Sequence, residues 1–521
     1  MVRPRIMTSF FLAVFFNALV WVSLVPLWHF PDEQAHFGQV AFFAENGRMP
    51  IDEENDLTQE VYTSEILLGT FRDNLGKNRF THHPEYRIEY TDSFYGMYEA
   101  SLAALSKEDT RKQLVHREST RYPPLYYIPA SFFYKFFYHF DLFTRVVTTR
   151  IWSLFLFMGT IYITYSLAKR IFQKTQESIA IAALVGFQPM MIFANVGVNS
   201  DALGNFLFIV FLIAGTLMVL KGINLNRALF LSISSLFCVL SKPQFIITLP
   251  LVVLLFFFVA VRDLRRKDFS KRVIILPFII CAVFILLYKK NFGSVGLIDQ
   301  FMKTNNISSL LKFTWEYSLP HSVREVMPWF WGIYDWLGVT YPRSIHRIIN
   351  RIVFVAVVGL IPAFFIFVKR KMWYSRRVQS LLFLAGVAFV YIASIFYYDW
   401  FSWYTGGYVL GVQGRYLFPT ISIYMVILLI GWRQLFSFNS TLHTWSIFIL
   451  SLLMICLNIY ALYTIAKTYY DISSFSIFLT QVSQYKPWFF KGVYSIFLWL
   501  VTIISLVTFL LTYVTDRGKG K

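Results

Sequence analysis

The chain has 521 residues, of which 56% are hydrophobic and only 15% charged, and 56 of them are phenylalanine. A water-soluble domain could not bury that much apolar surface, so the composition predicts an all-α, multi-pass membrane protein. The net charge of +19 does not indicate nucleic-acid binding, because the basic residues cluster in short segments between apolar runs, as in cytoplasmic loops. The three cysteines lie inside apolar runs and indicate neither a disulfide framework nor a metal site.

The first apolar run, residues 7–27, follows a short basic N-terminus and has no small-residue cleavage site after it. We therefore expect a retained first span whose N-terminus lies in the cytoplasm. The stretch 28–121 holds 17 acidic and 10 basic residues, so its charge places it on the non-cytoplasmic side. We expect 28–145 to form a large, helical first external loop, and loops of this length are usually functional.

The end of this loop, residues 122–140, is aromatic and apolar but is interrupted by prolines and Lys135. Aromatic residues of this kind are typical of a helix that lies at the bilayer surface. The next apolar run, 146–167, is followed by basic residues that should be cytoplasmic, so 122–140 must return to the side from which it started. We predict a juxtamembrane or re-entrant helix there.

Ten more apolar runs follow and alternate across the membrane without conflict. They are about 178–198, 202–220, 228–241, 244–261, 272–289, 350–369, 379–397, 416–432, 444–466 and 492–514. Every strongly basic turn then falls on one side, together with both chain ends. The sequence thus predicts one transmembrane domain over 1–521 in the plasma membrane, with about 12 transmembrane helices (range 11–13), cytoplasmic termini and a second external loop at 291–347.

The runs 228–241 and 244–261 have basic residues at both outer ends, so the chain must turn back at Ser241-Lys242-Pro243-Gln244. At 1.5 Å per residue the first arm spans only about 21 Å, short of the roughly 30 Å hydrocarbon core. Lys242 is therefore expected below the outer interface, facing protein or water instead of lipid. Ionisable residues at such a depth are usually functional.

Directly after the first span comes Pro31-Asp32-Glu33. Proline suits the first helical position, and the helix dipole favours acidic residues in the first turn. We expect a helix from here to Asn46-Gly47, with His36 one turn after Asp32 on the same face. The simpler interpretation is that this stretch only starts a helix well and has no chemical role.

Further polar side chains gather on the predicted outer side. Asn199 and Asp201 lie in a tight turn, Lys242 lies at the tip of the hairpin, and Gln413 and Arg415 open the tenth span. Two of them have structural alternatives, because Asp201 could cap its helix and Arg415 could extend to the interface from an apolar span. The convergence of carboxylates and cations on one face favours a functional site.

The sequence makes no firm prediction of a cofactor. Asp32, Glu33 and Asp201 are carboxylates that could share a divalent metal ion, and the sequence leaves this open. His82 and His83 lack a third ligand at zinc spacing, so we interpret them as solvated surface residues.

Such a site suits transfer from a lipid phosphate whose head group lies at the outer interface. Lys242 and Arg415 can bind the phosphate and stabilise it as it leaves. Asp32 can take a proton from an acceptor hydroxyl, with Glu33 positioning the acceptor and His36 orienting Asp32. The hypothesis is an inverting glycosyltransferase that moves a sugar from polyprenyl phosphate to a glycan, lipid or protein acceptor on the outer face of the membrane.

The motifs, in this order, resemble a widespread family of prokaryotic membrane proteins with GT-C-type architecture. They are Pro31-Asp32-Glu33-x-x-His36-Phe37, Tyr122-Pro-Pro-Leu-Tyr-Tyr, Arg150, Gln188-Pro189, Asn199-Ser-Asp201, Ser241-Lys242-Pro243 and Gln413-Gly-Arg415-Tyr. The GT-C superfamily includes protein O-mannosyltransferases and lipid A aminoarabinose transferases, whose first external loop carries an essential acid. The resemblance implies that Asp32 takes the position of that acid and that Tyr122 and Arg150 are supporting polar residues.

Other functions are compatible with the same sequence. A transporter or flippase for lipid-linked glycans would place ionisable residues near the membrane midplane, often on repeated broken helices. Here these residues crowd one face, and no internal repeat is visible. A polysaccharide polymerase or ligase would use the same kind of donor, and the sequence does not separate it from the first hypothesis. A non-catalytic scaffold gives no reason for the acidic pair.

Overall fold

The computed structural model describes residues 4–51, 54–68, 70, 94–105, 108–116, 123–263, 306–335 and 337–515. Within these ranges the regular secondary structure is helical apart from two antiparallel ladders. In the first, β1 (Leu57–Thr58) pairs with β2 (Leu114–Val115), and in the second, β3 (Ile333–Tyr334) pairs with β4 (Val339–Thr340). Each strand has two residues, so the predicted all-α class is confirmed.

Nine helices in the described ranges are long and apolar enough to cross a membrane. They are α1 (Pro4–Leu24), α7 (Leu142–Phe172), α10 (Asp201–Lys221), η2 (Pro243–Ile247) with α12 (Thr248–Asp263), α18 (Arg343–Lys369), α19 (Arg376–Gly406), η7 (Gly414–Thr420) with α20 (Ile421–Leu435), α21 (Ser440–Tyr469) and α23 (Val493–Thr515). Each coincides with a predicted apolar run, which confirms the multi-pass prediction. The predicted span 272–289 lies outside the described residues.

The predicted span 178–198 is not one continuous helix. It consists of α8 (Thr175–Gly186) and α9 (Pro189–Val196), which are bent by 63° relative to each other. Pro189 begins α9, and the side chain of Gln188 caps it by accepting a hydrogen bond from the backbone N–H of Met191. The same glutamine donates to the carbonyl of Phe330, so a distant segment holds the bend in place.

The predicted hairpin is formed by α11 (Leu225–Ser241) and α12, which pack against each other. With 17 residues α11 is about 26 Å long, so it still falls short of a bilayer core of roughly 30 Å. Lys242 follows α11 in an extended conformation, and its side chain is only 7% exposed. It faces protein, as the sequence predicts.

The segment after α1 forms a set of short helices. They are α2 (Glu33–Asn46), α3 (Gln59–Leu67), α4 (Phe94–Ala104), α5 (Glu108–Lys112) and α6 (Tyr127–Phe136). Within the predicted juxtamembrane segment 122–140, α6 exposes Ile128, Phe132 and Phe136 at four-residue spacing and buries Tyr127 and Tyr134. One apolar face turned outward is the pattern of a helix at the bilayer surface.

A second set of short elements begins at Ile307. Five segments follow one another without a break up to Trp331, and we call them the loop helix: α15 (Ile307–Phe313), η4 (Thr314–Ser318), α16 (Leu319–His321), η5 (Ser322–Val326) and α17 (Met327–Trp331). The remaining short elements are η6 (Met372–Tyr374), α22 (Phe475–Val482) and η8 (Trp488–Phe490). The loop helix lies within the predicted second external loop, 291–347.

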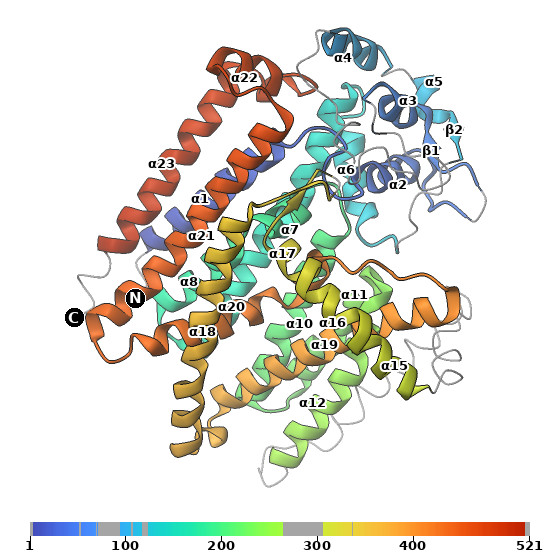
Figure 1. Ribbon diagram of the computed structural model, residues 1–521. Helices are drawn as coiled ribbons and strands as arrows, with labels where there is room; N and C mark the ends of the chain where they lie inside the picture. The colour runs from blue at the N-terminus through green and yellow to red at the C-terminus, as the bar shows by residue number, and fades with distance from the viewer. Residues whose placement is uncertain are drawn as a thin grey trace.

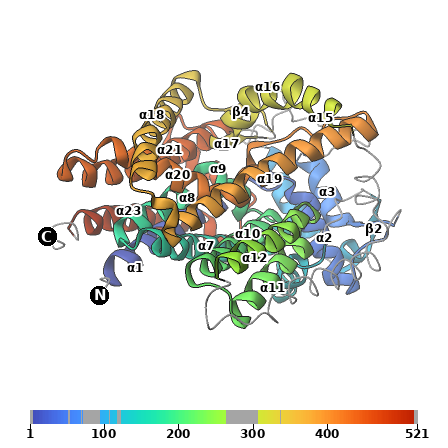
Figure 2. The ribbon, with the colours of Figure 1, turned by 90° about the horizontal axis from the view of Figure 1, so that it is seen from below.

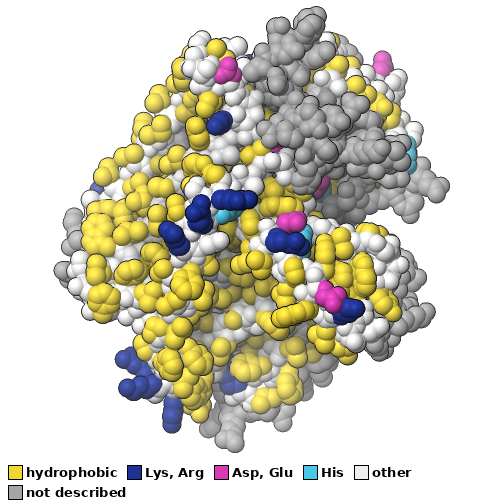
Figure 3. All heavy atoms as spheres, in the orientation of Figure 1, with side chains coloured by type: hydrophobic (Ala, Val, Ile, Leu, Met, Phe, Trp, Pro, Cys, Tyr) yellow, Lys and Arg dark blue, Asp and Glu magenta, His cyan; other side chains and the backbone are white. Residues whose placement is uncertain are grey.

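The long helices pack side by side. α1 packs against α7 and α23, α10 against α7 and α11, and α18 against α20. A Cβ on Gly359 of α18 would lie 1.9 Å from the carbonyl oxygen of Gly431 in α20, so only glycine permits this approach. Both chain termini lie at the end of the bundle opposite α2, α3 and β2 (Figures 1 and 2). Hydrophobic side chains cover most of the visible face over α18, α21 and α23 (Figure 3).

Candidate functional site

Four charged side chains from distant parts of the sequence meet, and we call them the ion-pair cluster: Asp32, Asp201, Lys242 and Arg415. Arg415 Nη2 donates to Asp32 Oδ2 at 2.7 Å, and Arg415 Nη1 lies 3.9 Å from Asp201 Oδ2. Lys242 Nζ donates to Asp201 Oδ1. All four are residues that the sequence analysis selects, and the structure places two cations against two carboxylates.

The four side chains of the cluster differ in accessibility. The side chains of Lys242 and Arg415 are 7% and 8% exposed, and that of Asp201 is 16% exposed. Asp32 has 34% of its side chain exposed, which makes it the most accessible group of the cluster. An incoming molecule can therefore contact Asp32, whereas protein covers most of the two cations.

The backbone at Asp32 differs from the expectation. The helix was predicted to include Asp32 in its first turn, and this is wrong, because α2 begins at Glu33 and Asp32 precedes it with φ of 55°. Aspartate is one of the few residues that adopt this left-handed conformation at modest cost. The change of backbone direction turns Asp32 toward Arg415 and Glu33 away from it. The predicted helix end is confirmed, since α2 ends at Asn46 with Gly47 as its cap.

Glu33 is fully buried and makes a two-fold ion pair with Arg150 of α7. Nε and Nη2 of Arg150 each donate to one carboxylate oxygen of Glu33 at 2.7 Å. The backbone N–H groups of Trp28 and Val198 donate to the same carboxylate at 3.2 Å. Glu33 thus joins the chain after α1, the start of α2, α7 and the turn before α10. The structure gives it the position of a structural clamp beside Asp32.

The C-terminal end of α1 is held by the same cation. Arg150 donates to the carbonyl oxygens of Val22, Val25 and Pro26 at 2.9 to 3.1 Å. A positive charge near the last turn of a helix is favourable because the carbonyl groups there carry partial negative charge. Arg150 therefore anchors the segment between α1 and α2 at both ends, through these carbonyl groups before Asp32 and through Glu33 after it.

His36 lies one turn into α2 and is 2% exposed. Its Nδ1 lies 2.7 Å from the hydroxyl oxygen of Tyr127 in α6, and the two rings stack. Burial lowers the pKa of His36 to about 3, and the positive charges of Lys242 and Arg415 add to this while Asp32 opposes it. His36 is therefore neutral at physiological pH and lies within electrostatic range of the cluster.

Asn199 links the segment before α2 to the start of α10. Its side-chain amide donates to the carbonyl of Pro31 at 2.8 Å, and its side-chain oxygen accepts from the backbone N–H of Asp201 at 2.8 Å. Asp201 begins α10, where Ser200 takes the N-cap position without a side-chain capping bond. The structure thus gives Asp201 to the ion-pair cluster, not to a helix cap.

Comparison with known proteins fits this picture of a membrane protein. The family model described as "Predicted membrane protein (DUF2142)" matches residues 15–424. The chain belongs to the DUF2142 family. The matched range includes all four residues of the ion-pair cluster as well as Glu33, His36 and Arg150. No curated protein matches the sequence of this DUF2142 member.

Two solved structures resemble this DUF2142 protein distantly. One is the archaeal oligosaccharyltransferase AglB from Archaeoglobus fulgidus, in complex with an inhibitory peptide and a dolichol-phosphate, with a TM-score of 0.43 and 12% identity over 88% of this chain. The chain spans 55% of the length of AglB. The other is ArnT from Cupriavidus metallidurans bound to undecaprenyl phosphate, with a TM-score of 0.41 and 13% identity over 99% of this chain and 79% of ArnT.

The carboxylates that could share a metal ion do not converge in this DUF2142 protein. Glu33 faces Arg150, whereas Asp32 and Asp201 face Arg415 and Lys242. Among the described residues, no three His, Cys, Asp or Glu side chains form a group that could hold a metal ion. The residues present do not fit a metal centre in this arrangement, and His82 and His83 lie outside the described ranges.

Of the other two selected residues, the structure describes only Gln413. Gln413 is half-buried and precedes η7, where its carbonyl accepts from the backbone N–H of Tyr416 at 3.0 Å. Tyr122 lies outside the described residues, but its neighbours Tyr126 and Tyr127 from the same motif contact the site. The hydroxyl group of Tyr126 accepts from the backbone N–H of Asn199 at 3.1 Å.

Lys486, in the segment between α22 and η8, is a buried cation near the Glu33–Arg150 pair that the sequence analysis did not select. Its side chain is 2% exposed and donates to the carbonyl of Val25 at 3.1 Å. Burial and the nearby charge of Arg150 lower the pKa of Lys486 well below its ordinary value, while Glu33 opposes this. The available signal was a lysine between Tyr485 and Pro487, followed by three aromatic residues just before the last span.

Proposed function

We propose that this DUF2142 protein is an inverting glycosyltransferase that moves a sugar from a polyprenyl-phosphate donor to an acceptor hydroxyl at the outer face of the plasma membrane. The observation that carries the proposal is the ion-pair cluster. It places two nearly buried cations, suited to a lipid phosphate, next to one accessible carboxylate, suited to proton abstraction. The acceptor is a glycan, a lipid or a protein.

The two ion pairs imply an order of events. Arg415 and Lys242 form ion pairs with Asp32 and Asp201. A donor phosphate that binds the two cations competes with the carboxylates for their N–H groups. Binding of the donor therefore releases Asp32 from Arg415, so the base becomes free only when the sugar is in place.

The transfer is a single displacement at the anomeric carbon of the sugar. Asp32 takes the proton of the acceptor hydroxyl while the acceptor oxygen forms a bond to the anomeric carbon from the face opposite the phosphate. The bond between the anomeric carbon and the phosphate oxygen breaks, and its electron pair stays on that oxygen. Lys242 and Arg415 stabilise the added negative charge on the leaving phosphate. The sugar is transferred with inversion, and polyprenyl phosphate is the second product.

Phosphate binding can be tested without knowledge of the sugar. Undecaprenyl phosphate is titrated into the purified protein and into the variants Lys242→Ala and Arg415→Ala. Loss of one charge-assisted hydrogen-bonding group costs about 1.5–3 kcal/mol, so Kd should rise about 10- to 100-fold in each variant. Arg415→Lys should keep only part of the affinity, because the planar fork that grips two oxygens is lost.

The matched control for this titration is Arg370→Ala, since Arg370 is an exposed arginine of the basic turn between α18 and α19, on the side predicted to be cytoplasmic. Its Kd should equal that of the unmodified protein. Thermal unfolding of every variant separates loss of binding from loss of fold. Unchanged Kd in both Lys242→Ala and Arg415→Ala would remove the basis of the proposal.

The reaction itself is identified in cells. Mass spectrometry of envelope glycans and lipid-linked sugars is compared between a deletion strain and the same strain carrying the intact gene. A glycosyltransferase predicts an accumulated lipid-linked sugar together with an envelope component that lacks the same sugar. A deletion strain in which both pools are unchanged contradicts the proposal.

A transporter of lipid-linked glycans is the second candidate, and the bend of 63° between α8 and α9 favours it. Broken helices frequently line the substrate sites of transporters. Proteoliposomes with a labelled polyprenyl-phosphate sugar separate the two functions. A transferase releases polyprenyl phosphate when an acceptor is added, whereas a transporter moves the intact lipid between leaflets.

A further inference from the structure

The loop helix carries a continuous apolar stripe on its outer side. Six residues at four-residue spacing are between 40% and 75% exposed: Ile307, Leu311, Trp315, Leu319, Val323 and Met327. Charged residues lie next to the stripe, among them Lys312, Glu316 and Arg324. An apolar stripe with a charged border is typical of a helix that lies in the membrane interface.

The alternation of helix types keeps this stripe straight. In an α-helix of 3.6 residues per turn, a step of four residues overshoots a full turn by about 40°, so a four-residue repeat would wind around the helix. The π-helical segments η4 and η5 have wider turns, so the same step falls short there. The two deviations have opposite sign, and the stripe runs along one side of the loop helix.

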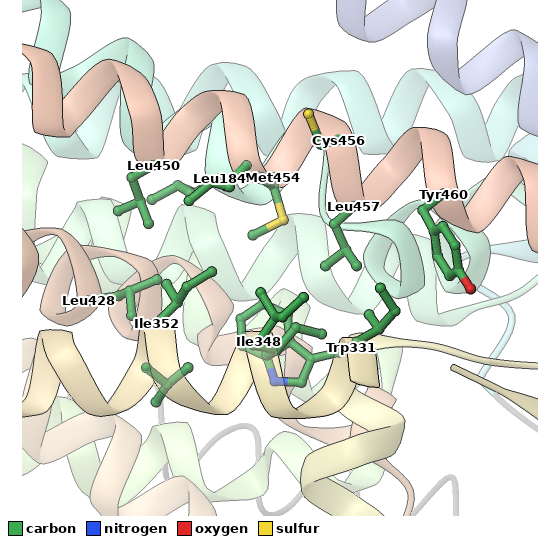
Figure 4. Close-up of a pocket in the computed structure, with 14 residues that line it drawn as sticks. Leu184, Trp331, Ile348, Ile352, Leu428, Leu450, Met454, Cys456, Leu457 and Tyr460 are labelled. Carbon is green, nitrogen blue, oxygen red and sulfur yellow. The ribbon is translucent and has the colours of Figure 1, made fainter. Parts of the chain in front are cut away.

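The next position of the repeat is Trp331, and it lines a cavity of about 290 Å³ between α18 and α21. Met454, Leu457 and Tyr460 point from α21 toward Ile348 and Trp331 (Figure 4). None of the 14 lining residues is charged, and Leu184 of α8 and Leu428 of α20 extend the apolar wall. Such a lining suits a hydrocarbon chain and not a sugar, whose hydroxyl groups would lose their hydrogen bonds there.

The end of the loop helix also touches the segment that carries Arg415. A Cβ on Gly414 would lie 2.1 Å from the backbone nitrogen of Phe330, so η7 and α17 are in direct backbone contact. Phe330 precedes the cavity residue Trp331, and Gly414 precedes the cluster residue Arg415. With 3.8 Å between consecutive Cα atoms, the cavity and the cluster begin only on the order of 10 Å apart along the backbone.

We propose that this cavity binds the first isoprenoid units of the lipid whose phosphate is held by Lys242 and Arg415. The inference rests on the proposed function and deepens it, because it assigns a separate site to the donor's chain. The apolar stripe is continuous with the cavity, so a lipid in the outer leaflet can pass along the loop helix to Trp331. One lipid then occupies both places, with its phosphate at the cluster and its chain between α18 and α21.

A thiol placed in the cavity tests the proposal. The full chain is prepared with Cys238, Cys281 and Cys456 changed to Ser and with Leu457→Cys, and its reaction with an apolar maleimide is timed. At about ten times its Kd, undecaprenyl phosphate leaves about one site in eleven free, so the labelling rate should fall about tenfold. Inorganic phosphate and phosphatidylglycerol at equal concentration should leave the rate unchanged.

A second reporter provides the matched control. Gly386 borders another apolar groove, between α12 and α19, where a Cβ would meet nothing within 4 Å, so Gly386→Cys adds a thiol without a clash. Its labelling rate should not respond to undecaprenyl phosphate. Adding Arg415→Ala to the Leu457→Cys protein should shift protection to higher lipid concentration, because phosphate and chain belong to one molecule.

The possible results are distinct. If phosphatidylglycerol protects Leu457→Cys as well as undecaprenyl phosphate does, the cavity is a site for ordinary membrane lipid and the proposal is overturned. If undecaprenyl phosphate binds in the titration but leaves the labelling rate unchanged, its chain lies elsewhere and the proposed function still stands. If it does not bind the protein at all, the proposed function and this inference fail together.

Discussion

The neighbours Asp32 and Glu33 have opposite surroundings although both are carboxylates. The side chain of Asp32 is 34% exposed and pairs with Arg415, whereas Glu33 is fully buried and accepts four hydrogen bonds. The left-handed backbone at Asp32 separates the two side chains. A group that takes a proton needs access to its substrate, and only Asp32 has it.

Asp32→Asn keeps the shape of the side chain and removes its basicity. We expect transfer to fall by about 10² to 10⁴, the usual contribution of a general base, with undecaprenyl-phosphate binding retained. Complementation of the deletion strain, followed by mass spectrometry of the envelope glycan, measures this. Asp471→Asn, at an aspartate of the loop after α21, is the control and should complement fully. Near-normal complementation by Asp32→Asn would mean that Pro31-Asp32-Glu33 only precedes a helix and has no chemical role.

Glu33→Gln is expected to act on folding. From the sequence alone, Glu33→Gln is expected to reduce activity less than Asp32→Asn, because Glu33 is expected only to position the acceptor. In the structure, the substitution leaves the buried guanidinium of Arg150 without its counter-charge, and breaking a buried pair costs about 3–5 kcal/mol. We expect a lower thermal midpoint and lower yield, measured beside Asp32→Asn. A Glu33→Gln protein that is stable but inactive would instead indicate a chemical role.

At the level of elements, the long helices are predictable because each needs about 20 apolar residues, a strong local signal. The bend between α8 and α9 is not predictable, since Gln188-Pro189 is compatible both with a continuous span and with a break between two helices. The cluster is predictable in its residues but not in its pairing. Arg415 meets Asp32 across 383 positions, and only packing decides which partner it finds. Lys486 was not selected because it bonds to the backbone carbonyl of Val25, and a carbonyl partner cannot be recognised from the sequence.

The contact between α17 and η7 makes its own prediction. Gly414→Ala would place a Cβ 2.1 Å from the Phe330 nitrogen, so one element must shift and Arg415 shifts with it. Overpacking typically costs about 1–3 kcal/mol, so we expect a lower thermal midpoint and weaker undecaprenyl-phosphate binding. Gly386→Ala is the control, since its Cβ meets nothing within 4 Å and a helical alanine is favoured by about 0.5–1 kcal/mol. Equal binding by both variants would separate η7 from the donor site.

At the scale of the whole molecule, the acidic segment after α1 and the basic chain ends lie apart, as the charge pattern of the sequence predicts. The termini lie at one end of the bundle and α2, α3 and β2 at the other (Figures 1 and 2). Arg433, in the last turn of α20, pairs with the buried carboxylate of Glu177 at 2.8 Å and so joins α8 to α20. The orientation relative to the membrane stays a prediction.

That orientation can be measured with an impermeant thiol reagent. In a chain whose three cysteines are changed to serine, Arg48→Cys lies after α2 and Lys371→Cys between α18 and α19, and both native side chains are exposed. Glu60, in the same predicted external loop, is unsuitable because it is buried. We expect Arg48→Cys to react in intact cells and Lys371→Cys to react only after the membrane is opened, because basic turns are retained in the cytoplasm. Reaction of both thiols from the same side would contradict the topology and, with it, an active site that faces outward.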